Sequence, residues 1–217
     1  MTTARFKPIF GVLLALLAIG ARGAWAGNLR ILAFGTSLTQ GYGLPPGAEL
    51  PVVLQARLRA AGIVATIINA GVSGDTSADG LSRLEWSLAD RPDAIILEMG
   101  SNDALRGIDP SQTRKNLAAI LARLRSAHIP VLLLGMRAPR NLGRDYARSF
   151  DAMYPDLARQ YDAIFYPFVL DGVALNPKLN QADGIHPNPA GVRIIAEKLL
   201  PYVERLVSEA RMAKGNR

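Results

Sequence analysis

The sequence predicts an α/β fold, a three-layer α/β/α sandwich built on a five-stranded parallel sheet. From Leu29 onward, five short and nearly continuous apolar runs alternate with longer amphipathic segments. Apolar runs of this kind are typical of strands that are covered on both faces. Strands that alternate with helices are joined by right-handed crossovers, which make the strands parallel. No repeat or low-complexity linker interrupts the pattern, so residues 27–217 are predicted to form a single domain.

Each element can be assigned in chain order. The predicted strands are LRILAFG (29–35), VATIINAG (64–71), DAIILEMG (93–100), PVLLLGM (130–136) and the weaker AIFYPF (163–168). The predicted helices cover about 49–61, 76–89, 111–127, 144–161 and 189–210, and the polar end EARMAKGNR is expected to be a frayed helix end. Boundary signals agree with these ranges: Asp75-Thr76-Ser77 supplies cap residues, Gly62 suits a helix stop, and Asn188-Pro189 suits a cap followed by a first-turn proline.

The first 26 residues are interpreted as a signal peptide rather than as part of the fold. Arg5 and Lys7 precede the apolar run IFGVLLALLAI, and small residues lead to the sequence AWA ending at Ala26. The apolar run is shorter than the roughly 18–20 residues that a membrane span requires. We therefore expect cleavage after Ala26, export to the periplasm or the medium, and no stable membrane anchor.

Composition excludes several classes of function. The signal segment removes three basic residues and no acidic one from the 25 basic and 18 acidic residues of the chain, which leaves a net charge of +4. Basic residues are scattered among acidic ones, so nucleic-acid binding has little support. The chain has no cysteine and two histidines, which excludes a thiolate nucleophile and makes a poor metal site.

The glycine-rich stretch FGTSLTQGYG (34–43) follows the first predicted strand and invites two interpretations. Its glycines do not have the spacing of a phosphate-binding loop, and no lysine follows them. Ser37 instead lies just beyond the strand, at the start of a helical turn. Ligands of parallel α/β sheets bind beyond the carboxyl ends of the strands. A serine there is either a helix cap or a nucleophile, and a nucleophile requires a base.

His186 is the better candidate for that base. It lies in ADGIHPNPAG, where Pro187 keeps it out of helical geometry, whereas His128 lies away from the carboxyl ends of the strands. Asp183 can turn back to accept the Nδ1–H of His186, which leaves Nε2 facing Ser37. An Asp-Gly turn beside a surface histidine explains the pair equally well.

Donors for an oxyanion are also present at the strand ends. Gly74 follows the second strand, where its backbone N–H is free of side-chain obstruction, and Asn102 follows the third strand with a neutral amide donor. Each of these residues alone also suits a turn or a cap. The predicted fold brings four residues to one face of the domain: Ser37, Gly74, Asn102 and His186. Turn preferences alone do not explain this coincidence.

The order Ser37, Gly74, Asn102, His186 resembles the four blocks of the SGNH (GDSL-type) hydrolases. The segments GVSGDTS, GSNDALRG and DGIHPN are similar to the bacterial periplasmic acyl-CoA thioesterase I, lysophospholipase and arylesterase group, over about residues 29–206. The resemblance implies a flavodoxin-like sandwich, a Ser37–His186–Asp183 triad, and Ser37, Gly74 and Asn102 as oxyanion donors. The chain departs from the family at Thr36, where Gly-Asp-Ser-Leu is usual; the orienting acid, Asp183, is unaffected.

The expected reaction is acyl transfer to water without metal or cofactor, on a small-molecule ester or thioester. The loops 104–110 and 135–143 are expected to cover an acyl chain, with Leu105, Ile108, Arg137 and Pro139 as substrate-binding residues, whereas Arg106 is expected to be exposed or locally paired. Two alternatives stay open: a carbohydrate O-acetylesterase with a small polar pocket, and a non-catalytic periplasmic binding protein.

Overall fold

The computed structural model describes residues 28–215 and contains one parallel five-stranded sheet with the strand order β2-β1-β3-β4-β5. The strands are β1 (Leu29–Gly35), β2 (Ala65–Gly71), β3 (Ala94–Glu98), β4 (Val131–Leu134) and β5 (Ile164–Tyr166). The predicted α/β class, strand number and parallel direction are confirmed. The signal-peptide prediction falls on residues outside the described range.

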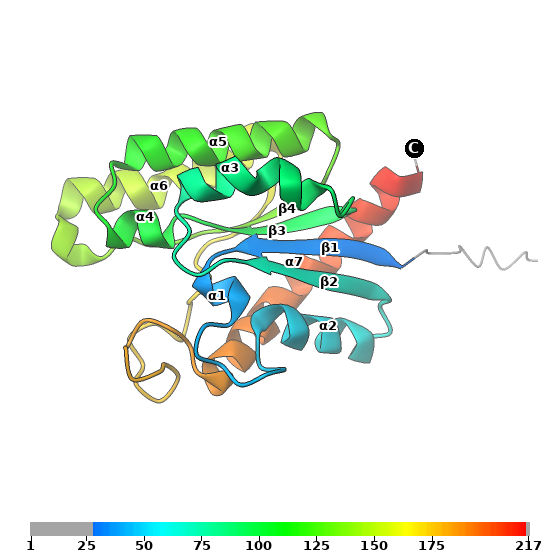
Figure 1. Cartoon of the computed structure of the whole chain (residues 1–217), viewed down its shortest axis with the longest axis horizontal. Helices are drawn as coiled ribbons and strands as arrows, with labels where there is room; N and C mark the ends of the chain where they lie inside the picture. The colour runs from blue at the N-terminus through cyan, green and yellow to red at the C-terminus, as the bar shows by residue number, and fades with distance from the viewer. Residues whose placement is uncertain (1–27, 216–217) are drawn as a thin grey trace, which may run out of the picture.

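Helices cover both faces of the sheet, as the three-layer prediction requires. Figure 1 shows α3 (Ser77–Leu88), α5 (Pro110–Ser126) and α6 (Arg144–Tyr161) on one face, and α2 (Leu50–Ala60) and α7 (Pro189–Gly215) on the other. The predicted boundary signals act as expected at two of these helices. Thr76 caps α3 in a reciprocal capping box with Asp79, and the Asn188 side chain accepts hydrogen bonds from the first turn of α7.

The core lies between these layers and accounts for the continuous apolar strands. Phe34, Ile95, Leu97 and Leu133 have no exposed surface, because helices cover both faces of β1, β3 and β4. β1 pairs with β2 on one side and with β3 on the other, so the residues that follow it lie between the segments that follow those two strands.

The structure differs from the prediction in its short helices and at its C-terminal end. The helices α1 (Ser37–Gln40) and α4 (Ser101–Leu105) and the 3₁₀ helix η1 (Arg140–Leu142) are too short for hydrophobic periodicity to reveal. The expectation of a frayed end from about residue 210 was wrong. α7 continues to Gly215, Ala210 is buried, and Lys214 Nζ lies 3.0 Å from Asp93 Oδ1. Within residues 28–215, no helix combines the length and apolarity needed to cross a membrane.

Candidate active site

Ser37 lies just beyond the carboxyl end of β1, as the first residue of α1. Gly35 and Thr36 form the turn between β1 and this helix. A side chain at Gly35 would lie 2.1 Å from Thr39 Oγ1 and 2.8 Å from Glu98 Oε2, so the turn requires glycine. Thr36, not Ser37, occupies the N-cap position. The Ser37 hydroxyl is therefore not a helix cap.

Ser37, His186 and Asp183 lie in one hydrogen-bonded chain. His186 Nε2 is 2.9 Å from Ser37 Oγ, and His186 Nδ1 is 2.7 Å from Asp183 Oδ2. The other carboxylate oxygen of Asp183 accepts hydrogen bonds from the backbone N–H groups of Ile185 and His186, at 2.9 and 3.0 Å. The residues 183–186 thus form a local turn that fixes the orientation of the imidazole.

The carboxylate of Asp183 determines which nitrogen of a neutral His186 carries the hydrogen. The backbone N–H and the side chain of His186, with the backbone N–H of Ile185, lower the pKa of Asp183 to about 2. An ionised carboxylate can only accept hydrogen bonds, so the hydrogen of a neutral His186 lies on Nδ1. Nε2 is then the acceptor of the Ser37 hydroxyl. This is the arrangement in which a histidine can remove the serine proton.

The Gly74 and Asn102 candidates lie beyond the ends of the two strands that flank β1. Gly74 has φ of +86°, a conformation that favours glycine, and its carbonyl accepts a hydrogen bond from Arg106 Nη2 at 2.8 Å. Asn102 is a residue of α4, whose N-cap is Gly100. Its Nδ2 donates to the carbonyl oxygen of Asp75 at 2.8 Å. One amide hydrogen is thus used to orient the side chain, and the second is free for another acceptor.

Sequence reasoning missed a buried carboxyl group behind the serine. Glu98, the last residue of β3, has no exposed surface and accepts hydrogen bonds from Thr36 N at 2.9 Å, from Thr36 Oγ1 at 3.0 Å and from Thr39 Oγ1 at 3.0 Å. Burial raises the pKa of Glu98 to about 7, although the hydrogen bonds from Thr36 and Thr39 oppose this shift. A glutamate within the apolar run DAIILEMG was the available signal, because a buried carboxyl requires partners.

Thr36 therefore does more than preserve polarity in the turn. Its backbone N–H and its hydroxyl both bind Glu98, and its Oγ1 lies 3.3 Å from Ser101 Oγ at the start of α4. The threonine that departs from the usual Gly-Asp-Ser-Leu block links the ends of β1 and β3.

An apolar depression begins beside the serine. A cavity of about 160 Å³ contains Ser37, Asn102 and His186 in its lining and is also bordered by Leu105, Arg137 and Pro139. A second cavity of about 530 Å³ shares Met136, Arg137, Pro139, Leu170 and Ile185 with the first and adds Phe168 and Leu175. The Arg137 guanidinium lies over the Phe168 ring, 4.7 Å from its centroid. Shared lining residues make the two cavities neighbours.

Three of the four residues predicted to bind substrate line these cavities, and Ile108 does not. The carbonyl of Ile108 accepts a hydrogen bond from the Tyr146 hydroxyl at 2.7 Å, which directs this part of the loop toward α6. Arg106 is exposed, as expected, although it donates to Gly74. His128 lies in the turn before β4, away from Ser37.

Tyr42 is a further site residue that the sequence did not reveal. Its ring centroid is 4.8 Å from that of His186, and Gln181 Nε2 donates to its carbonyl oxygen at 2.7 Å. The contact connects the loop after α1 to the loop that carries the histidine.

Among residues 28–215, no group of three or more His, Asp or Glu side chains is arranged to hold a metal ion.

Comparisons with known proteins identify a family and several relatives. The model of the GDSL-like lipase/acylhydrolase family matches residues 33–194. Thioesterase 1/protease 1/lysophospholipase L1 of Escherichia coli K12 is 38% identical over 196 residues, which cover 90% of this chain and 92% of that protein. An arylesterase of Vibrio mimicus is 35% identical over 169 residues, 77% of this chain and 84% of that protein. The crystal structure of AlinE4, an SGNH-hydrolase family esterase, aligns with a TM-score of 0.70 and 48% identity, over 82% of this chain and 96% of that chain.

Proposed function

Because the chain belongs to the GDSL-like lipase/acylhydrolase family and is a hydrolase of ester bonds, we propose that it cleaves carboxylic esters and thioesters of acyl chains through Ser37, His186 and Asp183. The observation that carries the proposal is the hydrogen-bonded chain from Asp183 through His186 to Ser37, which opens onto an apolar cavity. Relatives named as thioesterase, lysophospholipase and arylesterase support the substrate class.

The reaction has two acyl-transfer steps. Ser37 Oγ attacks the carbonyl carbon while His186 Nε2 accepts its proton, and Asp183 stabilises the imidazolium through Nδ1–H. Collapse of the tetrahedral intermediate breaks the bond to the alcohol or thiol, which takes the proton from Nε2. Water then repeats the sequence on the acyl-enzyme, with His186 as base, and releases the carboxylic acid and free Ser37.

Three donors would meet the negative charge that develops on the carbonyl oxygen. They are the backbone N–H groups of Ser37 and Gly74 and the Nδ2 hydrogen of Asn102 that does not bind Asp75. Ser37 N–H lies at the first position of α1, and Gly74 N–H belongs to a residue without a side chain. A preorganised donor contributes most to the transition state, so these groups should affect kcat more than KM.

The size and the apolar lining of the neighbouring cavity favour an acyl chain as substrate over an acetylated sugar. Its lining is largely apolar, with Met136, Phe168, Leu170 and Ile185, and at about 530 Å³ it is larger than an acetyl group needs. A series of p-nitrophenyl esters of increasing length tests this point. We expect kcat/KM to rise from acetate toward longer chains, and a maximum at acetate would favour the O-acetylesterase alternative.

Ser37→Ala tests the proposed mechanism directly. Loss of the nucleophile should lower ester hydrolysis by more than about 10⁴-fold, and the fluorophosphonate label that reacts with wild-type protein should no longer be incorporated. Ser126→Ala is the matched control, because this hydroxyl donates to the Arg123 carbonyl on α5. Labelling or ester hydrolysis that persists in folded Ser37→Ala would contradict Ser37 as the nucleophile.

We also propose that residues 1–26 direct export and are removed, as their charged start, apolar run and AWA sequence indicate. Mass spectrometry of the protein from the periplasm or medium should find an N-terminus at Gly27. An intact Met1 in a membrane fraction would contradict this proposal.

A further inference from the structure

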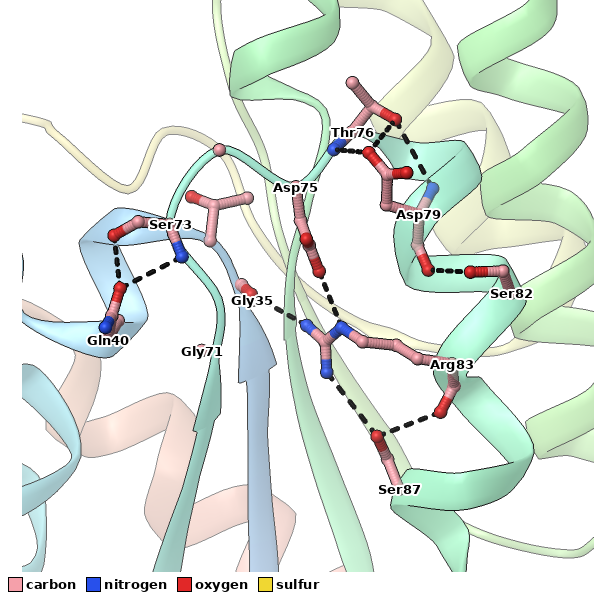
Figure 2. Close-up of polar contacts among 12 residues, drawn as sticks. Gly35, Gln40, Gly71, Ser73, Asp75, Thr76, Asp79, Ser82, Arg83 and Ser87 are labelled. Carbon is pink, nitrogen blue, oxygen red and sulfur yellow. Dashed lines mark hydrogen bonds and ion pairs between the residues drawn. The ribbon is translucent and has the colours of Figure 1, made fainter.

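Arg83, on α3, makes an unusually enclosed set of contacts near the site. Its Nε lies 2.6 Å from Asp75 Oδ2, and the two side chains are 17% and 14% exposed. Among the ion pairs within residues 28–215, no other has both side chains below 20% exposure. The guanidinium also donates from Nη2 to the Gly35 carbonyl at 3.0 Å and lies 4.0 Å from the Phe34 ring centroid. Figure 2 shows this fork between the end of β1 and Asp75.

Two of the three acceptors of Arg83 belong to the segments that carry the proposed chemistry, and the third, Ser87 Oγ at 3.4 Å, lies on α3 itself. Gly35 is the last residue of β1 and precedes Ser37 by two residues. Asp75 directly follows Gly74, and its carbonyl oxygen holds Asn102 Nδ2 at 2.8 Å. One guanidinium therefore contacts both the turn of the nucleophile and the loop of the oxyanion donors, without facing the substrate itself.

The loop of residues 72–76, which we call the oxyanion loop, is held mainly by side chains. Among them, Arg106 donates to the Gly74 carbonyl and Asn102 donates to the Asp75 carbonyl, each at 2.8 Å. The oxyanion loop lies beyond the end of β2, so the regular ladder of strand hydrogen bonds no longer holds it. Its backbone is joined to Gly35 by Val72 N–H, and Ser73 N and Oγ both donate to the side chain of Gln40 on α1. Figure 2 shows Gln40 at one end of this loop and Arg83 at the other.

The shape of the guanidinium suits this task better than any other side chain. Its N–H groups are fixed in one plane, so two bonds from one group set the distance and angle between their acceptors. A lysine amine keeps the charge beside Asp75, but it has no such planar fork. The contacts with Gly35 and Asp75 thus connect the turn before Ser37 to the residue that follows Gly74 and binds Asn102.

We propose that Arg83 is a positioning residue of the oxyanion hole, which locks the oxyanion loop to the turn that carries Ser37. The inference rests on the proposed function, because it assigns Gly74 and Asn102 the role of oxyanion donors. It adds a residue that touches no substrate and acts through Gly35 and Asp75.

The test compares steady-state kinetics of Arg83→Lys and Arg83→Gln on a p-nitrophenyl ester. A displaced donor should lower kcat by roughly 10- to 100-fold in Arg83→Gln and less in Arg83→Lys, with KM within about twofold of wild type. Arg123→Gln is the matched control. It removes an ion pair of the same length, Arg123 Nε to Glu85 Oε1 at 2.6 Å, on the exposed side of α3. Its kcat should equal that of wild type.

A double-mutant cycle with Asn102→Ala separates positioning from general stability. If Arg83 acts through the oxyanion hole, the loss of kcat in Arg83→Lys/Asn102→Ala should be smaller than the product of the two single losses. A wild-type kcat in folded Arg83→Lys and Arg83→Gln would overturn the inference, as would fully multiplicative losses. If Arg83→Gln does not fold, Arg83→Lys decides, since it retains a positive charge beside Asp75.

If the proposed function is wrong, a different variant reveals it. In that case Ser37→Ala would retain activity, whatever the Arg83 variants do. An inactive Ser37→Ala together with fully active Arg83 variants would reject only the positioning role.

Discussion

Asp183 and His186 are held mainly by hydrogen bonds within a single loop, with the Tyr42 ring beside His186, whereas Ser37, Gly74 and Asn102 are held by side chains from distant strands and helices. In the pair of Asp183 and His186, both carboxylate oxygens of Asp183 bind groups no more than three residues away in the sequence. Around Ser37 and the oxyanion donors, hydrogen bonds join residues far apart in the sequence: Glu98 and Thr36 are 62 positions apart, Arg83 and Gly35 are 48 apart, and Asn102 and Asp75 are 27 apart. The proposed base is therefore oriented mainly by local sequence, and the proposed nucleophile and oxyanion donors by the fold.

Among variants that leave Ser37 in place, the largest effect should come from the pair held within one loop, Asp183 and His186. Asp183→Asn keeps an oxygen for the backbone N–H groups but places an amide N–H opposite His186 Nδ1, which favours the wrong tautomer. We expect kcat to fall by roughly 10³- to 10⁴-fold with little change in melting temperature. Asp171→Asn is the control, since Asp171 pairs with Lys198 on the surface. An Asp183→Asn enzyme with normal kcat would show that the local turn does not govern the base.

Asn102→Ala tests the second group of residues, Ser37 and the oxyanion donors, which are held by long-range contacts. Loss of one preorganised donor should lower kcat by roughly 10²- to 10³-fold and leave KM nearly unchanged. Asn116→Ala removes a similar amide, which donates to Ser77 Oγ at 3.0 Å, and should leave kcat unaltered. If Asn102 serves only to hold Asp75, the variant would instead show a normal kcat and a lowered melting temperature.

Glu98→Gln tests the buried carboxyl through the pH dependence of stability. Because the pKa of Glu98 is raised to about 7 from 4.5, the native state keeps a proton that the unfolded chain has lost between these values. The free energy of unfolding of wild type should therefore fall as pH rises from about 4.5 to 7, by up to about 3 kcal/mol relative to Glu98→Gln. Urea unfolding at several pH values measures this difference, and parallel curves for the two proteins would contradict the prediction.

The smallest effects on kcat should come from two helix caps, one beside the oxyanion loop and one beside the loop that carries His186. Thr76→Ala removes the cap of α3, and Asn188→Ala removes the hydrogen bonds to the first turn of α7. Each should lower the free energy of unfolding by about 1 kcal/mol and change kcat only a few-fold. A much larger loss of kcat in Asn188→Ala than in Thr76→Ala would show that the loop of the base also depends on its flanking helix.

The same contrast explains how much of the molecule could be predicted from its sequence. Continuous apolar runs such as LRILAFG and cap signals such as Asn188-Pro189 identified the sheet and the main helices, because periodicity and caps are local properties. The spacing from Asp183 to His186 likewise indicated their contact, which the structure shows at 2.7 Å. Their catalytic role stays a prediction.

The supports of the nucleophile could not be predicted in this way. Nothing near Arg83 in the sequence indicates that it reaches Gly35, and Glu98 differs from its neighbours only by its charge within an apolar strand. Ile108 was expected beside the substrate because it follows a strand end, but its loop turns toward Tyr146. Such contacts depend on how loops pack together, which periodicity and spacing do not encode.

The hydrogen bond between Ser37 and His186 joins residues that are 149 positions apart. Contacts of such high sequence separation cost much loop-closure entropy, and topologies rich in them fold slowly. The pairing of β1 with β2 and β3 and the docking of α7 must be in place before the imidazole can reach the serine. Under the proposed mechanism, a chain that has not yet brought its C-terminal quarter back to β1 holds an unactivated serine, so hydrolytic activity would report on the last stage of folding.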